Sequence, residues 1–163
     1  VQVVRAEYFK HGFKAKNIEH VNITEDIVTH FALNREQERA FRLIANHASS
    51  IAPDQLKMYL GGMGGTGKTQ VIKAVLEMFK RKKESHRFIV VAPTGTAAAL
   101  LNGSTYHSAF GIHIKGKNEA GMGRSSVDLI NELREKLAGV EYVFLDEVSM
   151  ISCHELYALS ARM

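Results

Sequence analysis

The order of hydrophobic and polar positions along the chain predicts an alternation of strands and helices. Short apolar runs with the length of buried strands occur at 56–60, 87–93 and 140–147. Apolar residues at helical spacing predict helices from Asn34 to about 48, over 68–83 and over 126–139. Strands that alternate with helices form βαβ units, so we expect an α/β fold with a parallel sheet covered on both faces.

Local signals mark the ends of several elements. Asn34 is a strong helix N-cap, and Gln37 occupies the reciprocal capping-box position. A further helix is expected over 94–102, ended by Gly103, and a last one from about Ser149. The other segments are 1–9, which could form a strand, 25–33, a short helix or turn, and 111–125, a Gly- and Lys-rich stretch expected to be a mobile surface loop.

The most specific motif is GMGGTGKT, which fits the phosphate-loop pattern G-x-x-x-x-G-K-[ST] at every position. It lies between a predicted strand and a predicted helix, where its glycines let successive backbone N–H groups face a phosphate. Lys68 can then reach the β- and γ-phosphates, and the Thr69 hydroxyl can ligate Mg²⁺. A glycine turn with a solvated lysine is the alternative. The predicted nucleotide-binding residues are Gly62, Gly64, Gly65, Thr66, Gly67, Lys68 and Thr69.

The third predicted strand ends in two adjacent carboxylates, Asp146 and Glu147. In a parallel sheet this strand end shares the carboxyl edge with the phosphate loop, and ligands bind at that edge. We expect Asp146 to hold Mg²⁺, directly or through water, and Glu147 to orient or deprotonate the attacking water. Lys68 and Glu147 are therefore the predicted catalytic residues, and the adjacent Glu favours ATP hydrolysis over kinase chemistry. Alternatively, the two acids only stabilise the first turn of the following helix.

Composition limits the class of protein more than its function. The 163 residues carry a formal net charge of +4, which permits a polyanionic partner without requiring one. Cys153 is the one cysteine, so an internal disulfide framework is excluded. No apolar run approaches the about 18–20 residues of a membrane span, and no signal peptide is visible, so we expect no membrane association. The chain does not begin with methionine, and we expect it to be a piece of a longer one.

Three further stretches accompany GGMGGTGKT and FLDEVSM: LNREQERAF at 33–41, APTGTAAALL at 92–101 and GSTYHSAFGI at 103–112. In this order they resemble the Pif family of superfamily-1 DNA helicases, nearest to its Helitron-type branch. The resemblance covers 33–163 and leaves 1–32 as an unassigned N-terminal extension. It implies a three-layer, RecA-like P-loop NTPase domain that hydrolyses ATP with Mg²⁺, contacts single-stranded DNA and moves 5′ to 3′. It also implies a role in DNA repair, recombination, telomere maintenance or transposition, in the nucleus or the mitochondrion.

The same resemblance implies roles for single residues. Gln37 corresponds to the glutamine that reads the adenine edge, although a capping-box role alone also accounts for it. Tyr106 or Phe110 could stack on a base, or could be buried, as aromatic residues more often are. The residues implied to face DNA are Pro93, Thr94, Gly95, Thr105 and His107, of which His107 could instead be a structural histidine.

Two other features have simple explanations. The stretch FKRKKESHR at 79–87 resembles a nuclear-import or nucleic-acid patch, but it also lies at the end of a helix, where cations are favoured and solvated. Cys153 and His154 are neighbours on a predicted helix and therefore do not face each other as a catalytic pair would.

We expect the second RecA-like domain of this family, and its glutamine-containing sensor motif, to lie outside this sequence. The family places a further strand between the acidic strand and the phosphate-loop strand, and the residues after Asp146 are too few to build it. We therefore expect an incomplete sheet, weak binding of Mg·ATP and no unwinding of duplex DNA by residues 1–163. The alternatives are a P-loop ATPase of another class, or a non-catalytic, transposon-derived relic that binds nucleotide or DNA.

Overall fold

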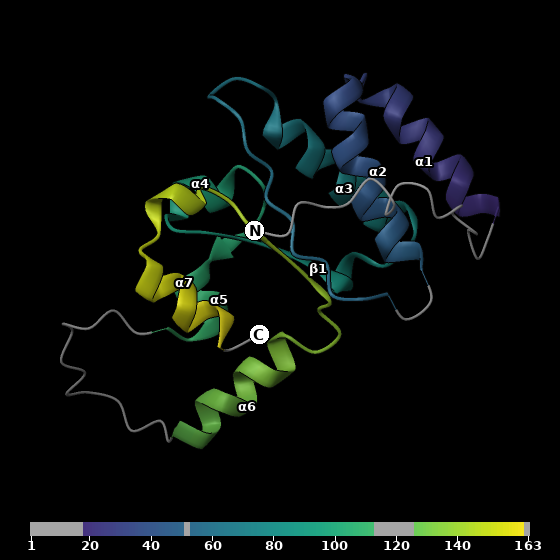
Figure 1. Ribbon diagram of the computed structural model, residues 1–163. Helices are drawn as coiled ribbons and strands as arrows, with labels where there is room; N and C mark the ends of the chain where they lie inside the picture. Colours follow the sequence, from purple (N-terminus) through teal and green to yellow (C-terminus); the bar gives the residue numbers. More distant parts are fainter. Residues whose placement is uncertain (1–17, 51–52, 113–125, 162–163) are drawn as a thin grey trace. The chain divides into compact units, whose positions relative to one another are not determined.

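The computed structural model describes residues 18–50, 53–112 and 126–161 (Figure 1). The chain divides into two compact units, and the division falls after Ser85. The strand expected at 1–9 lies outside the described residues, as does the loop expected at 111–125 apart from its first two residues. No helix in the described part of the chain is long and apolar enough to cross a membrane.

The first unit contains the helices α1 (Ile18–His30), α2 (Arg35–Ser49) and α3 (Lys68–Arg81) (Figure 1). The three helices pack against one another through apolar positions at helical spacing. Their largest fully buried side chains are Ile27, Phe41, Val71, Ile72, Val75, Met78 and Phe79. Burial of a side chain of this size contributes about 1.5–3 kcal/mol. The helix that follows the phosphate loop is therefore anchored along its whole length by apolar contacts.

Asn34 begins α2 as the sequence predicts. Its Oδ1 accepts hydrogen bonds from the backbone N–H groups of Glu36 (3.1 Å) and Gln37 (3.0 Å). In return, Gln37 Oε1 accepts a hydrogen bond from the N–H group of Asn34 (3.0 Å). These bonds satisfy donors that have no partner within the helix. The predicted capping box is confirmed.

α1 covers a segment for which the sequence left a short helix or a turn open, and it is a helix that begins before residue 25. Arg42 of α2 donates two hydrogen bonds to the carboxylate of Glu25 in α1, over 2.7 and 2.8 Å. These bonds lower the pKa of Glu25. At the other end of α1, Gln70 Nε2 in α3 donates to the carbonyl of Phe31 (3.2 Å). α1 is thereby tied by polar contacts to both other helices.

The second unit is built on a parallel sheet with strands β1 (Phe88–Ala92), β2 (Ser104–Thr105) and β3 (Tyr142–Leu145), in the order β2-β1-β3. Ala92 lies opposite Thr105, and Val91 lies opposite Leu145, so the carboxyl ends of all three strands meet at one edge. The helices of this unit are α4 (Gly95–Ala99), α5 (Tyr106–Phe110), α6 (Ser126–Lys136) and α7 (Cys153–Ser160). The predicted α/β fold with a parallel sheet is confirmed.

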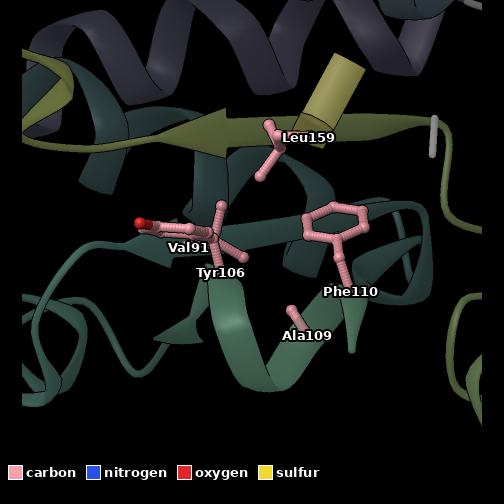
Figure 2. Packing of buried hydrophobic residues seen from close by; sticks show 5 residues of the cluster. All are labelled: Val91, Tyr106, Ala109, Phe110 and Leu159. Carbon is pink, nitrogen blue, oxygen red and sulfur yellow. The ribbon is translucent and has the colours of Figure 1, made fainter. Parts of the chain in front are cut away.

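One hydrophobic cluster holds α5 and α7 to the sheet (Figure 2). Its members are at most 3% exposed: Val91 of β1, Tyr106, Ala109 and Phe110 of α5, and Leu159 of α7. Leu145 at the end of β3 and Ile151 after it are partly buried and pack against the same cluster. The segments that follow β2 and β3 therefore share one core.

Residues 56–60 do not form the predicted strand. A strand needs a neighbouring backbone for its hydrogen bonds, and no ladder within the described residues includes this segment. Its side chains still alternate, because Leu56, Met58 and Leu60 are half-buried while Lys57 and Tyr59 are exposed. The segment thus keeps the alternating burial of a strand without hydrogen bonds to a neighbouring strand, in agreement with the expected incomplete sheet.

Four predicted helices are shorter than expected, and two of them, α3 and α6, only end early, at Arg81 and Lys136. The helix predicted from Ser149 begins at Cys153, because the 3₁₀ turn η3 (Val148–Met150) comes first. The helix predicted over 94–102 ends at Ala99. Asn102 has a φ of 51°, which turns the chain back toward β1. At Gly103 the chain passes so close to that strand that a Cβ atom would lie 2.5 Å from the carbonyl oxygen of Val90.

Candidate nucleotide and DNA site

The phosphate loop leads directly into α3, which begins at Lys68. Gly65 and Gly67 have φ angles of 79° and 82°, in the left-handed region that favours glycine. Gly67 precedes the helix and has no side chain to cap it, so the first N–H groups of α3 are left for an anion. Residues 61–66 are exposed. The loop therefore leads into a helix as its sequence motif predicts, whereas no strand precedes it within the described residues.

The ammonium group of Lys68 lies against the loop that precedes it. Its Nζ donates hydrogen bonds to the carbonyl oxygens of Gly62 (2.9 Å) and Met63 (3.1 Å). The Thr66 hydroxyl donates to the same carbonyl of Met63 (2.9 Å). An ammonium group binds a charged phosphate oxygen more strongly than a neutral carbonyl. Lys68 is thus placed to exchange these loop carbonyls for the oxygens of a bound phosphate.

Gln37 joins the start of α2 to the phosphate loop. While its Oε1 accepts the capping-box hydrogen bond, its Nε2 donates to the carbonyl oxygens of Thr66 (3.2 Å) and Gly67 (3.5 Å). Recognition of an adenine edge would use the same amide as acceptor and donor. Adenine reading by Gln37 stays a prediction, and it requires that these bonds be exchanged. The link to the loop itself was not predicted from the sequence.

Alanine should be tolerated at Gly64 and not at Gly67. A Cβ atom at Gly67 would collide with Nε2 of Gln37, whereas a Cβ atom at Gly64 would have no neighbour within 4 Å. Left-handed backbone alone costs a non-glycine residue about 1–2 kcal/mol. We expect Gly67→Ala to lower the free energy of unfolding by about 1–2 kcal/mol, because the end of the Gln37 side chain can move aside while the backbone strain stays, and Gly64→Ala by less than about 0.5 kcal/mol. Urea unfolding of the two variants measures the difference, and equal losses would contradict this loop geometry.

β3 delivers the acidic pair to the carboxyl edge of the sheet. The N–H group of Asp146 donates to the carbonyl of Val91 (2.9 Å), and Asp146 Oδ1 accepts from the N–H group of Glu147 (2.9 Å). This leaves the second oxygen of Asp146 for a metal ion, and carboxylate oxygen is a ligand that Mg²⁺ prefers. Glu147 is exposed and has a φ of 50°. Glu147 is the N-cap residue of the 3₁₀ turn η3, but its side chain makes no capping hydrogen bond there, and the N-cap of α7 is Ser152, so the capping alternative is not supported.

The residues implied to face DNA lie at the ends of β1 and β2, along the same edge. Pro93 and Thr94 follow β1 directly and are half-buried, and Gly95 is exposed. Thr94 Oγ1 accepts the N–H group of Ala97 as the N-cap of α4, and Thr105 Oγ1 accepts that of Ser108 as the N-cap of α5 (both 3.3 Å). A hydroxyl that accepts a capping bond still has a hydrogen to donate, and that of Thr94 lies 3.2 Å from the hydroxyl of Thr96, with which it shares a hydrogen bond. A phosphate oxygen is an acceptor of the kind that such hydroxyls contact.

Tyr106 and Phe110 are not placed to stack on a base. They are 2% and 3% exposed and belong to the cluster in Figure 2, so the alternative of burial is confirmed. The ring of His107 is stacked on that of Tyr106, with 4.0 Å between centroids, and His107 is only half-buried. His107 is therefore the more exposed ring of the pair and stays the predicted DNA contact.

Tyr106 also makes a polar contact that the sequence did not predict. Its hydroxyl donates to Glu155 Oε1 in α7 (2.9 Å). Hydrogen bonds from the side chain and backbone of Ser152, and then from Tyr106, lower the pKa of Glu155 to about 2. Burial, and then the bond to Glu155, raise the pKa of Tyr106 to about 12. The sequence signal that could have located Glu155 is the S-x-x-E capping box at 152–155.

The stability that Glu155 and Tyr106 contribute should depend on pH on both sides of neutrality, first through the bonds from Ser152 and the burial of Tyr106, and then through the bond between the two side chains. The pKa of Glu155 falls on folding from 4.5 to about 2, so its stabilising effect is present above 4.5 and is lost as the pH falls toward 2. The pKa of Tyr106 rises from 10.0 to about 12, so its effect is present below 10 and is lost as the pH rises toward 12. We expect Tyr106→Phe to lower the thermal midpoint most between about pH 5 and pH 9. A difference that does not change with pH would contradict this assignment.

Three basic residues of the segment at 79–87 make contacts within the chain. Arg81 Nε donates to Glu77 (2.9 Å), and Lys82 Nζ donates to the hydroxyl of Ser49 (2.7 Å). Arg87 donates to Glu141 (2.7 Å), which lies just before β3. These contacts favour the simpler interpretation of the segment over a nucleic-acid patch.

The structure groups the predicted residues in two sets. The first unit holds Gln37 beside the loop from Gly62 to Thr69, and the second unit holds Asp146 and Glu147 on the edge that also carries the threonines and His107. The roles of these residues toward ATP, Mg²⁺ and DNA stay predictions.

A glycine-rich loop that opens a helix, together with a parallel sheet whose strand ends in Asp-Glu, places this chain in the class of RecA-like P-loop NTPase domains. The family described as PIF1-like helicase matches residues 32–163. The chain belongs to this family, as its motifs implied.

Curated relatives agree with this family. ATP-dependent DNA helicase PIF4 of Trypanosoma brucei brucei is 29% identical over 136 residues, which are 83% of this chain and 15% of that protein. ATP-dependent DNA helicase Pif1 of Bdellovibrio bacteriovorus is 34% identical over 134 residues, 74% of this chain and 29% of that protein. The chain thus spans less than a third of the length of either relative. No solved structure gives a significant match.

Proposed function

We propose that this chain is a motor-domain segment of an ATP-dependent DNA helicase that moves 5′ to 3′ and that binds and hydrolyses Mg·ATP. The observation that carries the proposal is the phosphate loop, in which Lys68 lies at the loop carbonyls and α3 opens toward it, in a chain of the PIF1-like helicase family. The curated relatives bear the name ATP-dependent DNA helicase.

Each polar residue of the site has a role in this proposal. Lys68 binds the β- and γ-phosphates, Thr69 and Asp146 ligate Mg²⁺, and Glu147 activates the attacking water. Hydroxyl and carboxylate oxygens suit Mg²⁺, which bridges the phosphates and neutralises the charge that develops on them. Gln37 exchanges its bonds to the loop and to the N–H group of Asn34 for the adenine edge.

Single-stranded DNA is the proposed second ligand. Pro93, Thr94, Gly95, Thr105 and His107 contact its phosphates through backbone, hydroxyl and imidazole groups. Repair, recombination, telomere maintenance or transposition, in the nucleus or the mitochondrion, are the proposed settings, and they rest on the family resemblance. The chain alone is not expected to unwind a duplex, and duplex unwinding by residues 1–163 would refute that expectation.

Equilibrium binding to the 163-residue chain tests the proposal. We expect a fluorescent ATP analogue to bind weakly and to depend on Mg²⁺, and a labelled oligothymidylate to bind with an affinity that falls as salt is raised. Nucleotide binding without DNA binding would favour a P-loop ATPase of another class. DNA binding without nucleotide binding would favour the non-catalytic alternative.

A further inference from the structure

Tyr106 lies between two segments of the second unit that have different proposed roles. Its chain neighbours Thr105 and His107 are proposed DNA contacts. Its hydroxyl donates over 2.9 Å to Glu155, which is 49 residues away in α7, the helix that follows the acidic pair. This bond joins α5 to α7 by one side-chain contact.

Glu155 organises the chain that follows the acidic pair. Its Oε2 accepts hydrogen bonds from the N–H group (3.0 Å) and hydroxyl (2.6 Å) of Ser152. Between Glu147 and Ser152 lies only the η3 turn, in which the N–H group of Met150 donates to the carbonyl of Glu147 (2.9 Å). The path from the acidic pair to the start of α7 is therefore short and held by hydrogen bonds.

Tyr106, at the α5 end of the bond to Glu155, is also held in place by its neighbours. Tyr106 is 2% exposed and packs with Val91 and Leu159 in the cluster of Figure 2. The ring of His107 is stacked on its ring, and Thr105 caps the helix in which both aromatic residues lie. A displacement of the backbone at Thr105 or His107 therefore bears directly on Tyr106, the residue between them, and on its bond to Glu155.

We propose that Tyr106 is a positioning residue that couples DNA contact at Thr105 and His107 to the placement of Asp146 and Glu147. The coupling passes from the ring of Tyr106 to its hydroxyl, then to Glu155, and through the start of α7 to the acidic pair. It rests on the proposed function, because it assigns DNA and the metal-bound nucleotide to the two ends of this link.

Tyr106→Phe isolates the link, because it removes the hydroxyl and keeps the buried ring. Tyr157→Phe is the matched control, since Tyr157 lies on α7 and is 74% exposed. Both substitutions delete one hydroxyl, and only the first removes the bond to Glu155.

Amide hydrogen exchange without DNA tests whether the link exists. We expect Tyr106→Phe to speed exchange of the amides at 152–156 by about tenfold, and Glu155→Ala to speed exchange at 107–110 by a similar factor. Tyr157→Phe should change neither segment. Faster exchange that stays within the mutated segment, or that rises equally throughout the second unit, would overturn the link.

The same measurement with an oligothymidylate tests the coupling. In the wild-type chain, DNA should protect amides at 105–108 and also at 147–155, and in Tyr106→Phe only the first set should stay protected. Equal protection of the second set in both proteins would overturn the coupling. Absence of DNA-dependent protection anywhere in the wild type would overturn the proposed function and the coupling with it, while exchange without DNA would still decide whether the link exists.

Discussion

Replacement of Lys68 by alanine should weaken the binding of Mg·ATP to this chain by about 100-fold. Each hydrogen bond from an ammonium group to a charged phosphate oxygen contributes about 1.5–3 kcal/mol, so the loss of two such bonds corresponds to about 3 kcal/mol or more. The carbonyls of Gly62 and Met63, which Lys68 contacts in the structure, must be released when phosphate binds. We therefore expect the lower end of this range. Titration of a fluorescent ATP analogue in the presence of Mg²⁺ measures it.

Lys73→Ala is the matched control for this experiment. Lys73 lies on the same helix, five residues after Lys68, and is exposed. The substitution removes an equal charge and causes the same change in side-chain length on α3. We expect its nucleotide affinity to stay within about threefold of the wild type, since exposed charges are screened by solvent and salt. Equal losses in the two variants would show that net charge, and not the contact of Lys68, determines binding.

In a longer chain that extends through a second motor domain, Lys68→Ala should also abolish DNA-stimulated hydrolysis of ATP. Wild-type turnover in that variant would remove the assignment of the phosphate loop.

The predictions that succeeded depend on short-range chemistry. The capping box of Asn34 and Gln37 was predictable because both partners lie within one helical turn. The start of α3 at Lys68 was predictable because the glycines, Lys68 and Thr69 that mark it are contiguous in the chain. The strand of Phe88–Ala92 was predictable because a short, continuous apolar run bounded by Pro93 suits a central parallel strand.

The features that the sequence did not reveal depend on partners distant in the chain. The segment 56–60 has the alternation of a strand, but pairing depends on a neighbouring backbone that its own residues cannot specify. β2 has two residues, too few to give a period. The aromatic side chains of Tyr106 and Phe110 suited both stacking on a base and burial, and the cluster that they form with Val91 of β1 and Leu159 of α7 places them in the core.

Gln37 illustrates how a residue can satisfy a local rule and a long-range contact together. Its carbonyl oxygen serves the capping box, and its amide nitrogen serves the loop 29 residues away. The sequence motif identified the residue, and two interpretations of it were open. The structure confirms the capping box and adds the bond to the loop, while adenine reading, which requires both ends of the amide to exchange their partners, stays a prediction.

Substitution of Asp146 or Glu147 gives the second large expected effect, because loss of the two carboxylates should have different consequences. Asp146→Asn should weaken the Mg²⁺-dependent binding of nucleotide by at least about tenfold, because it removes the charge of a proposed metal ligand. An asparagine oxygen can still accept the hydrogen bond from the N–H group of Glu147, so the turn should persist. Glu147→Gln should leave Mg·ATP binding unchanged.

The rate of ATP hydrolysis, unlike the binding of Mg·ATP, should depend strongly on Glu147. General-base catalysis contributes about 10²–10⁴-fold, so Glu147→Gln should slow ATP hydrolysis by at least about 100-fold in a longer chain that extends through the second motor domain. Glu135→Gln, at an exposed position of α6, is the matched control and should change neither binding nor hydrolysis. Binding is measured by titration with and without Mg²⁺, and hydrolysis by release of inorganic phosphate. Glu147→Gln could instead lose Mg·ATP binding and keep its rate of hydrolysis at saturating ATP. In that case Glu147 would be the metal ligand and Asp146 the base.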